Sequence, residues 1–102
     1  PYLTMNIKQQ IFLIYKEVLH NIYKHSKAKN VEAKIYRNNN TITMSITDDG
    51  VGFDTSISTS GNGLQNIQKR STKINGEIIL SSRPGKGTSF TLIVRLVNIA
   101  YE

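Results

Sequence analysis

The placement of glycine constrains the fold of this chain more than any other feature. All seven glycines lie between residues 50 and 87, and the first 49 residues contain none. Glycine is disfavoured inside helices and strands and is common in turns, caps and loops that approach a ligand. The sequence therefore predicts continuous regular structure in the first half of the chain and the ligand loops in the second half.

The first half opens with a predicted helix. Residues 7–26 contain no Gly or Pro. Apolar side chains recur there at helical spacing: Ile7, Ile11, Ile14, Val18 and Ile22. This pattern predicts one long amphipathic helix that ends near Ser26. Residues 31–36 then alternate between apolar and polar side chains, which predicts a half-buried strand. Its inner face would carry Val31, Ala33 and Ile35.

A second strand follows a turn at the asparagines 38–40, which tolerate a left-handed backbone. Its inner face is predicted to carry Ile42, Met44 and Ile46. Because strand side chains alternate with a period of two, Asp48 should be the next inward residue and Asp49 should point outward. A carboxylate on the core face needs a partner, because leaving it unpaired costs several kcal/mol.

The second half of the chain alternates loops with short elements. The sequence predicts a long functional loop at 48–63 and then a short helix at 64–74, which is stopped by Asn75-Gly76. It also predicts two strands, at 77–82 and 88–97, which are joined by a hairpin at 83–87. The last strand should point four side chains inward: Phe90, Leu92, Val94 and Leu96. Two helices and four strands predict an α/β (α+β) two-layer sandwich, with a mixed, mostly antiparallel sheet covered on one face by helices.

Composition limits the function. The 102 residues suffice for one domain, 1–102, with 98–102 expected to be a loose tail. The absence of cysteine rules out disulfides and thiolate chemistry, and two histidines are too few for a His-rich metal site. No apolar run approaches the ~20 residues of a membrane span, and no secretory leader is visible. A net charge of +6 favours an anionic partner without choosing among nucleic acid, nucleotide and acidic protein.

Polar residues gather on one edge of the predicted first helix. Glu17, Asn21 and Lys24 project within roughly 60° of one another, and His25 lies slightly further round. A carboxylate, an amide oxygen and an ammonium grouped there suit hydrated Mg²⁺ with phosphates, although a solvated helix face gives the same pattern.

Three glycine-rich stretches supply the other candidates. Asp48-Asp49-Gly50-Val51-Gly52 would let a flat ligand approach the backbone, or would form an ordinary Asp-Gly turn. Gly61-Asn62-Gly63-Leu64 opens the second helix, where free N–H groups bind phosphate, but it matches neither a P-loop nor a dinucleotide fold and also fits a flexible cap. Gly85-Lys86-Gly87-Thr88 needs no function beyond a hairpin turn.

Taken in order, these motifs resemble a known family. The family is the ATP-binding catalytic domain of sensor histidine kinases. Its asparagine box is similar to Glu17-x-x-x-Asn21-x-x-Lys24-His25. Its glycine boxes are similar to the three glycine-rich stretches, the last of which is Gly85-Lys86-Gly87-Thr88-Ser89-Phe90. That domain belongs to the GHKL (Bergerat-fold) group with DNA gyrase, a class of heat-shock chaperones and the MutL proteins. The resemblance covers residues 7–97, and the Lys-His-Ser-Lys-Ala run at 24–28 is most similar to the NarL/DesK-type kinases.

The resemblance implies a role for each matching residue. Asn21 would coordinate Mg²⁺ through its side-chain oxygen, Lys24 would contact phosphate, and His25 would lie beside the nucleotide. Asp48 would accept a hydrogen bond from the adenine amino group, supported by Thr88.

The resemblance also assigns the glycines. Gly50 and Gly52 would give adenine room, and residues 53–63, with Gly61, Gly63 and Leu64 at their end, would form a mobile ATP lid. Glu17 matches the residue that activates water in the group's ATPases, so its role in a kinase is open. Catalysis would consist of positioning and charge neutralisation of the transferring phosphoryl group.

The chain has no helical hairpin with a phosphoacceptor histidine, because His20 and His25 both lie in the predicted nucleotide-binding helix. The resemblance therefore implies the monomeric cytoplasmic catalytic module of a larger, membrane-anchored receptor. Its partners would be ATP or ADP, the histidine-bearing dimerisation domain of the same protein and a downstream response regulator, without nucleic acid and without membrane insertion of its own.

Two other functions remain open at this point. An anti-sigma-type serine kinase or partner-switching module has the same ATP fold. A small basic nucleic-acid binder would need exposed aromatic residues between its Lys and Arg residues. We expect Phe12, Phe53 and Phe90 to lie in core or lid positions, which argues against the nucleic-acid binder.

Overall fold

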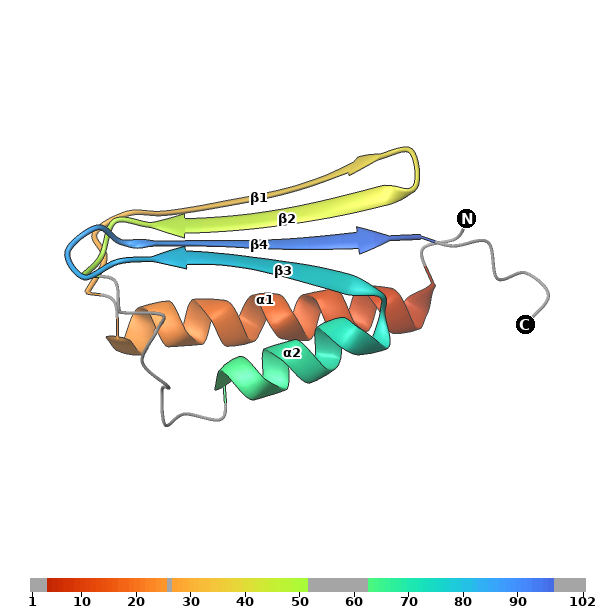
Figure 1. Ribbon diagram of the computed structural model, residues 1–102, viewed down its shortest axis with the longest axis horizontal. Coiled ribbons are helices and arrows are strands. Elements are labelled where there is room, and N and C mark those ends of the chain that lie inside the picture. Colours follow the sequence, from red (N-terminus) through yellow and green to blue (C-terminus); the bar gives the residue numbers. More distant parts are fainter. Residues whose placement is uncertain (1–3, 26, 52–62, 97–102) are drawn as a thin grey trace.

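A computed structural model describes residues 4–25, 27–51 and 63–96. Its elements are α1 (Met5–His25), β1 (Val31–Asn38), β2 (Thr41–Asp48), α2 (Gly63–Lys73), β3 (Gly76–Ser82) and β4 (Thr88–Arg95). Figure 1 shows both helices on one face of a four-stranded sheet. The predicted two-layer architecture is confirmed. Neither described helix has the length and hydropathy needed to cross a membrane.

The sheet has the strand order β1-β2-β4-β3, and every described pair of neighbouring strands is antiparallel. The parallel pairing allowed for in the expected mixed sheet is therefore absent from the described strands. Asp48 lies opposite Thr88, and Thr88 lies opposite Ser82. The register thus aligns three polar residues across β2, β4 and β3 at one end of the sheet.

The core fills the space between the helices and the two central strands. Its buried apolar residues come from all elements except β1 and β3, together with two residues that follow α2 and β4: Ile11, Ile14, Val18, Ile42, Met44, Ile46, Ile67, Ile74, Phe90, Leu92, Val94 and Leu96. The inward faces predicted for β2 and β4 are confirmed. Burying one such aliphatic or aromatic side chain contributes about 1.5–3 kcal/mol, so the central strands anchor the fold.

Local sequence explains where α1 begins and where α2 ends. The Thr4 hydroxyl accepts a hydrogen bond from the Ile7 N–H at 3.2 Å, so α1 begins at Met5, two residues before the predicted start. After α2, Asn75 takes the left-handed backbone, with φ of 56°. A Cβ on Gly76 would lie 2.5 Å from the Ser71 hydroxyl, so this turn needs glycine for close packing against α2.

The prediction of a half-buried first strand was wrong. All eight residues of β1 are exposed, although Val31, Ala33 and Ile35 do face the helix layer, because their partners across β2 are the inward residues. β1 is the edge strand on the side away from α2, and the helices leave it uncovered (Figure 1). Alternation in the sequence gave the direction of these side chains but not their burial.

Phe12 also departs from expectation. It was predicted in the core, but 57% of it is exposed, and the Lys16 ammonium lies 5.5 Å from the centre of its ring. Phe90 is buried as expected, and Phe53 lies outside the described residues. The absence of exposed aromatics therefore no longer argues against a nucleic-acid binder, and other observations must decide between the functions.

Candidate functional site

The Asp48 carboxylate is the most unusual group in the described part of the chain. It closes β2 with only 4% of the residue exposed. Oδ1 accepts a hydrogen bond from the Gly50 N–H at 2.7 Å, whereas no described group donates to the buried Oδ2. Leaving a buried acceptor unpaired costs about 1–3 kcal/mol. The fold therefore maintains a buried acceptor that a ligand with an N–H donor can satisfy.

Thr88 and Ser82 extend this polar row. The Ser82 Oγ donates its hydrogen to the Gly87 carbonyl at 3.2 Å and lies 2.8 Å from the Thr88 Oγ1. When Ser82 donates its one hydroxyl hydrogen to this carbonyl, Thr88 is the donor in the second contact. The Thr88 oxygen then offers only lone pairs to further partners. Asp48 and Thr88 together present two acceptors, which favours a ligand with an amino group.

The hairpin between β3 and β4 packs tightly against this row. Gly87 has φ of 79° and is buried, and a Cβ on it would lie 2.3 Å from the Asp48 carbonyl oxygen. The Gly85 N–H donates to the Val51 carbonyl on the segment that follows Asp48. The glycines predicted as a simple hairpin turn therefore also fix the backbone around the carboxylate.

The polar edge of α1 lies at the same end of the molecule. The carboxyl end of α1, the ends of β2 and β3 and the start of β4 all lie together there (Figure 1). Glu17 and Asn21 are half-buried and Lys24 is exposed, bordered by buried Ile14 and Val18 as predicted. A polar surface on the sheet and a polar edge on α1 thus lie at the same end of the molecule. Among the described residues, no three His, Asp or Glu side chains gather as a metal cluster.

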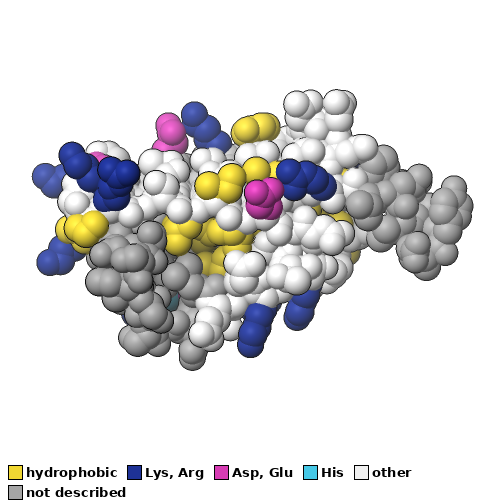
Figure 2. All heavy atoms as spheres, viewed as in Figure 1, with side chains coloured by type: hydrophobic (Ala, Val, Ile, Leu, Met, Phe, Trp, Pro, Cys, Tyr) yellow, Lys and Arg dark blue, Asp and Glu magenta, His cyan; other side chains and the backbone are white. Residues whose placement is uncertain are grey.

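This end of the molecule is also positively charged. Figure 2 shows Lys and Arg side chains gathered at the end where β2 finishes. Exposed cations there lie on the end of α1, on the connection to β1 and on the hairpin: Lys24, Lys27, Lys29, Arg83 and Lys86. Clustered cations raise the local concentration of an anion such as a polyphosphate.

Several predicted site residues cannot be placed in this geometry. Gly52 and Gly61, with most of the predicted lid at 53–63, lie outside the described residues. Gly63 is the first residue of α2, one residue before the predicted start of this helix, and His25 is the last residue of α1. The structure therefore brings together Asp48, Gly50 and Thr88 directly, while the roles of all the predicted site residues stay predictions.

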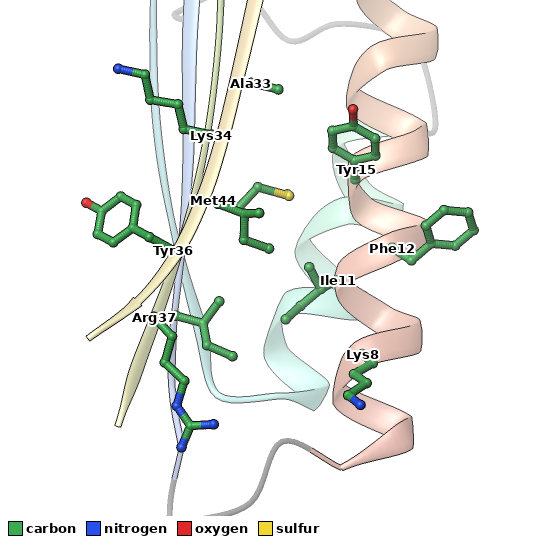
Figure 3. A pocket seen from close by; sticks show the side chains of 11 residues that line it. Lys8, Ile11, Phe12, Tyr15, Ala33, Lys34, Tyr36, Arg37 and Met44 are labelled. Atoms are coloured by element: carbon green, nitrogen blue, oxygen red, sulfur yellow. The ribbon is translucent and has the colours of Figure 1, made fainter. Parts of the chain in front are cut away.

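A groove between α1 and β1 lies at the opposite end of β2 from Asp48. It encloses about 540 Å³ and is lined by Lys8, Ile11, Phe12, Tyr15, Ala33, Lys34, Ile35, Tyr36, Arg37, Ile42 and Met44. Figure 3 shows Ile11 and Met44 reaching into the space between helix and sheet, whereas Lys34 and Tyr36 point away from α1. The lining is mainly apolar and holds no counterpart of the open Asp48 acceptor, so this groove is not the site built by the glycine motifs.

Comparison with known proteins decides the family. Residues 6–98 match the family model described as "Histidine kinase-, DNA gyrase B-, and HSP90-like ATPase". The chain belongs to this family. The match spans α1 to β4 and so includes the Asp48 row and the polar edge of α1.

The curated relatives are sensor kinases. The chain is 34% identical over 99 residues to an uncharacterized sensor-like histidine kinase of Chloroflexus aurantiacus, covering 90% of this chain and 17% of that protein. It is 29% identical over 90 residues to the histidine-protein kinase/phosphatase DegS of Brevibacillus brevis, covering 87% of this chain and 23% of the relative. The chain thus spans a quarter or less of the length of these two relatives.

Solved structures show the same fold. The histidine kinase domain of an Erythrobacter litoralis blue-light activated kinase matches with a TM-score of 0.75 and 19% identity, over 85% of this chain and 43% of that one. The Acinetobacter baumannii histidine kinase AdeS matches with a TM-score of 0.75 and 20% identity, over 88% of this chain and 47% of that one. At these identities the likeness concerns the fold alone.

Two residues of the site were missed from the sequence. Ser82 follows Ile78 and Leu80 with a period of two, so this alternation could have placed it on the inward face of β3. Asp49 was predicted to point outward, and it does, but its carboxylate accepts bonds from Lys29 and Asn30 that no sequence pattern indicates. Those contacts join segments 19 and 20 residues apart.

Proposed function

We propose that this chain is the ATP-binding catalytic domain of a sensor histidine kinase, which binds Mg-ATP and supplies the γ-phosphoryl group to a histidine on a separate dimerisation domain. The observation that carries the proposal is the buried Asp48 carboxylate with an open Oδ2, in a chain of this ATPase family. Ionised carboxylates only accept hydrogen bonds, and the adenine amino group is a donor.

Asp48, Thr88 and the glycines would form the adenine end of the site. The amino group has two N–H donors, which suit the two acceptors on Asp48 and Thr88, directly or through one water. Gly50 and Gly52 would leave room for the flat ring. These assignments fit the geometry of Asp48, Gly50 and Thr88, and they extend it to Gly52 by its motif.

The carboxyl half of α1 would hold the phosphates. Asn21 offers a neutral side-chain oxygen of the kind Mg²⁺ prefers, Lys24 would contact phosphate, and His25 would lie beside the nucleotide. Bound Mg²⁺ would neutralise charge on the phosphate oxygens. Gly61, Gly63 and Leu64 would complete the site from the lid and the start of α2, where free N–H groups favour phosphate. Glu17 would lie at the rim, and its role is the least defined of the set.

The partners follow from this role. The phosphoacceptor would be a histidine-bearing dimerisation domain of the same full-length protein, and a response regulator would receive the phosphoryl group. The domain would act in the cytoplasm, as a monomer in isolation, as part of a membrane-anchored sensor. Homologues with sensor-kinase names and the buried Asp48 acceptor support this proposal over a nucleic-acid binder, whereas the cationic end of the molecule fits either anion.

Phosphotransfer in trans tests the proposal. With γ-labelled ATP, the isolated chain should not label itself, because both of its histidines lie on α1, where in-line attack on a phosphate bound alongside is geometrically implausible. Adding the histidine-bearing domain of the full-length protein should give acid-labile label on that domain. Stable label on a protein serine would favour the serine-kinase alternative instead, and acid-labile label on His20 or His25 would contradict the proposal.

A further inference from the structure

Asp49 ties two distant segments together at the candidate site. Its Oδ1 accepts hydrogen bonds from the backbone N–H groups of Lys29 and Asn30 at 2.8 and 2.9 Å. Its Oδ2 accepts from the Asn30 side-chain amide at 2.9 Å, and its own N–H donates to the Asn30 carbonyl at 3.2 Å. Four contacts thus join the residue after β2 to the two residues before β1.

The joined segment is the short connection that leaves α1. Among its described residues, Lys27 takes a left-handed backbone with φ of 54°, and Lys27, Lys29 and Asn30 are all exposed. A non-glycine residue in this conformation costs roughly 1–2 kcal/mol. Ala28 is half-buried and the other three residues are exposed, so the contacts with Asp49 help to hold the connection against the end of β2.

Asp49 itself is not placed to touch a ligand. The Asp48 side chain faces the helix layer, whereas Asp49 is exposed and directs both carboxylate oxygens to the connection. On one side of this junction lies Asp48, the proposed adenine acceptor. On the other side the connection leads back to the carboxyl half of α1, which carries Asn21 and Lys24.

We infer that Asp49 is a positioning residue that sets the carboxyl end of α1 relative to Asp48, so that the adenine end and the phosphate end of one nucleotide are held at a fixed separation. This inference rests on the proposed function. It predicts a specific pattern, because only a ligand that bridges both ends depends on their separation. Loss of Asp49 should weaken Mg-ADP, which reaches both ends, and should spare adenosine, which reaches one.

The test compares Asp49→Ala with the unmodified chain, using adenosine and Mg-ADP as probes in NMR titrations. We expect Mg-ADP to bind about three- to tenfold more weakly and the affinity for adenosine to change less than about twofold. Asp49→Asn keeps an oxygen for the two backbone N–H groups and should retain most of the Mg-ADP affinity. Asn30→Ala removes one of the four contacts and should show a smaller loss with the same selectivity.

A matched control and a second readout separate positioning from a loss of stability. Glu77→Ala removes an exposed carboxylate that pairs with Arg95 at 3.2 Å, at the end of β3 and β4 opposite Ser82 and Thr88, and should change neither affinity. Without any nucleotide, Asp49→Ala should speed amide exchange at Lys29 and Asn30 while the core amides of β2 and β4 keep their protection.

The outcomes are distinct. Equal losses of adenosine and Mg-ADP affinity in Asp49→Ala, or no loss of either, would overturn the positioning role while leaving the nucleotide site in place. Failure of the unmodified chain to bind either probe would overturn the proposed function and this inference with it.

Discussion

Gly87→Ala gives a sharp test of how the hairpin holds Asp48, because Gly85 provides a matched control two residues away. Both glycines have φ of 79°, so alanine at either position meets the same left-handed backbone strain, about 1–2 kcal/mol. The surroundings differ. No described atom lies within 4 Å of a Cβ on Gly85, whereas a Cβ on Gly87 would lie 2.3 Å from the Asp48 carbonyl oxygen and 3.3 Å from the Asp49 Cα.

The atoms that Gly87→Ala would strike are backbone atoms at the end of β2, which cannot rotate away as a flexible side chain can. Relief of such overpacking typically costs about 1–3 kcal/mol, so Gly87→Ala should destabilise the fold by about 2–5 kcal/mol and Gly85→Ala by about 1–2 kcal/mol. The shift also moves Asp48. A hydrogen bond to a charged group is worth about 1.5–3 kcal/mol. Loss of the proposed hydrogen bond from the adenine amino group to the Asp48 carboxylate should therefore weaken ADP binding by roughly ten- to a hundredfold.

Urea unfolding and calorimetric titration with Mg-ADP measure both effects on the same two variants. Gly85→Ala should lose some stability and keep its affinity for Mg-ADP within about twofold, because its strain is local. If Gly87→Ala matches Gly85→Ala in both stability and affinity, the close packing of the hairpin on Asp48 does not shape the site, and the reasoning from the Gly87 contact is wrong.

Further predictions address the other residues of the site. Asn21→Ala should remove most of the Mg²⁺ dependence of nucleotide binding, since a methyl group cannot replace an oxygen ligand, and unchanged dependence in a titration would count against Asn21. Ser82→Ala frees the Thr88 hydroxyl to donate to the guanine carbonyl, so the preference for ATP over GTP should fall about three- to tenfold. The variant Ser81→Ala, which changes the exposed neighbour, should keep this preference. Hydrogen bonds from the Asn30 backbone and then from its side chain lower the pKa of Asp49. The stabilisation that these hydrogen bonds give through Asp49 is therefore complete above the unfolded-state pKa of about 3.9 and is lost as the pH falls below it. Asp49→Asn should make the free energy of unfolding depend less on pH in this acidic range. An unchanged pH dependence would argue against the hydrogen bonds from Asn30 to Asp49.

Much of the fold follows from the sequence because its periodic patterns are strong. The inward positions of β2 and β4 follow from alternation, and continuing it by one step located the buried Asp48. The end of α2 was predicted at Asn75-Gly76, and the structure separates their roles: Asn75 takes the left-handed backbone, while Gly76 allows contact with Ser71.

The errors arise where burial depends on a distant element. The alternation in β1 gave the correct face for Ile35, yet 61% of it is exposed, because the edge strand lies beyond the cover of the helices. Phe12 has helical neighbours in the core but projects outward beside Lys16. A local pattern carries no information on how far the facing layer extends, so it cannot predict either result.

The contacts of Ser82 and Asp49 were beyond prediction for a related reason. Each depends on the register between segments: Ser82 on the pairing of β3 with β4, and Asp49 on the approach of the connection from α1. The glycine motifs indicated the candidate site, but these long-range hydrogen bonds determine which lone pairs remain open in it.

Calorimetric titration of the chain and of Asp48→Ala with Mg-ATP and Mg-GTP tests the central claim most directly. The unmodified chain should prefer ATP by roughly tenfold to a few hundredfold, because guanine would set its carbonyl against the Asp48 acceptor. Asp48→Ala should weaken ATP sharply, leave the poor GTP binding nearly unchanged and alter the free energy of unfolding by no more than about 1 kcal/mol, since it removes an unpaired oxygen along with the bond to Gly50. Undiminished ATP binding in Asp48→Ala, or a greater loss in Asp49→Ala, would contradict the account.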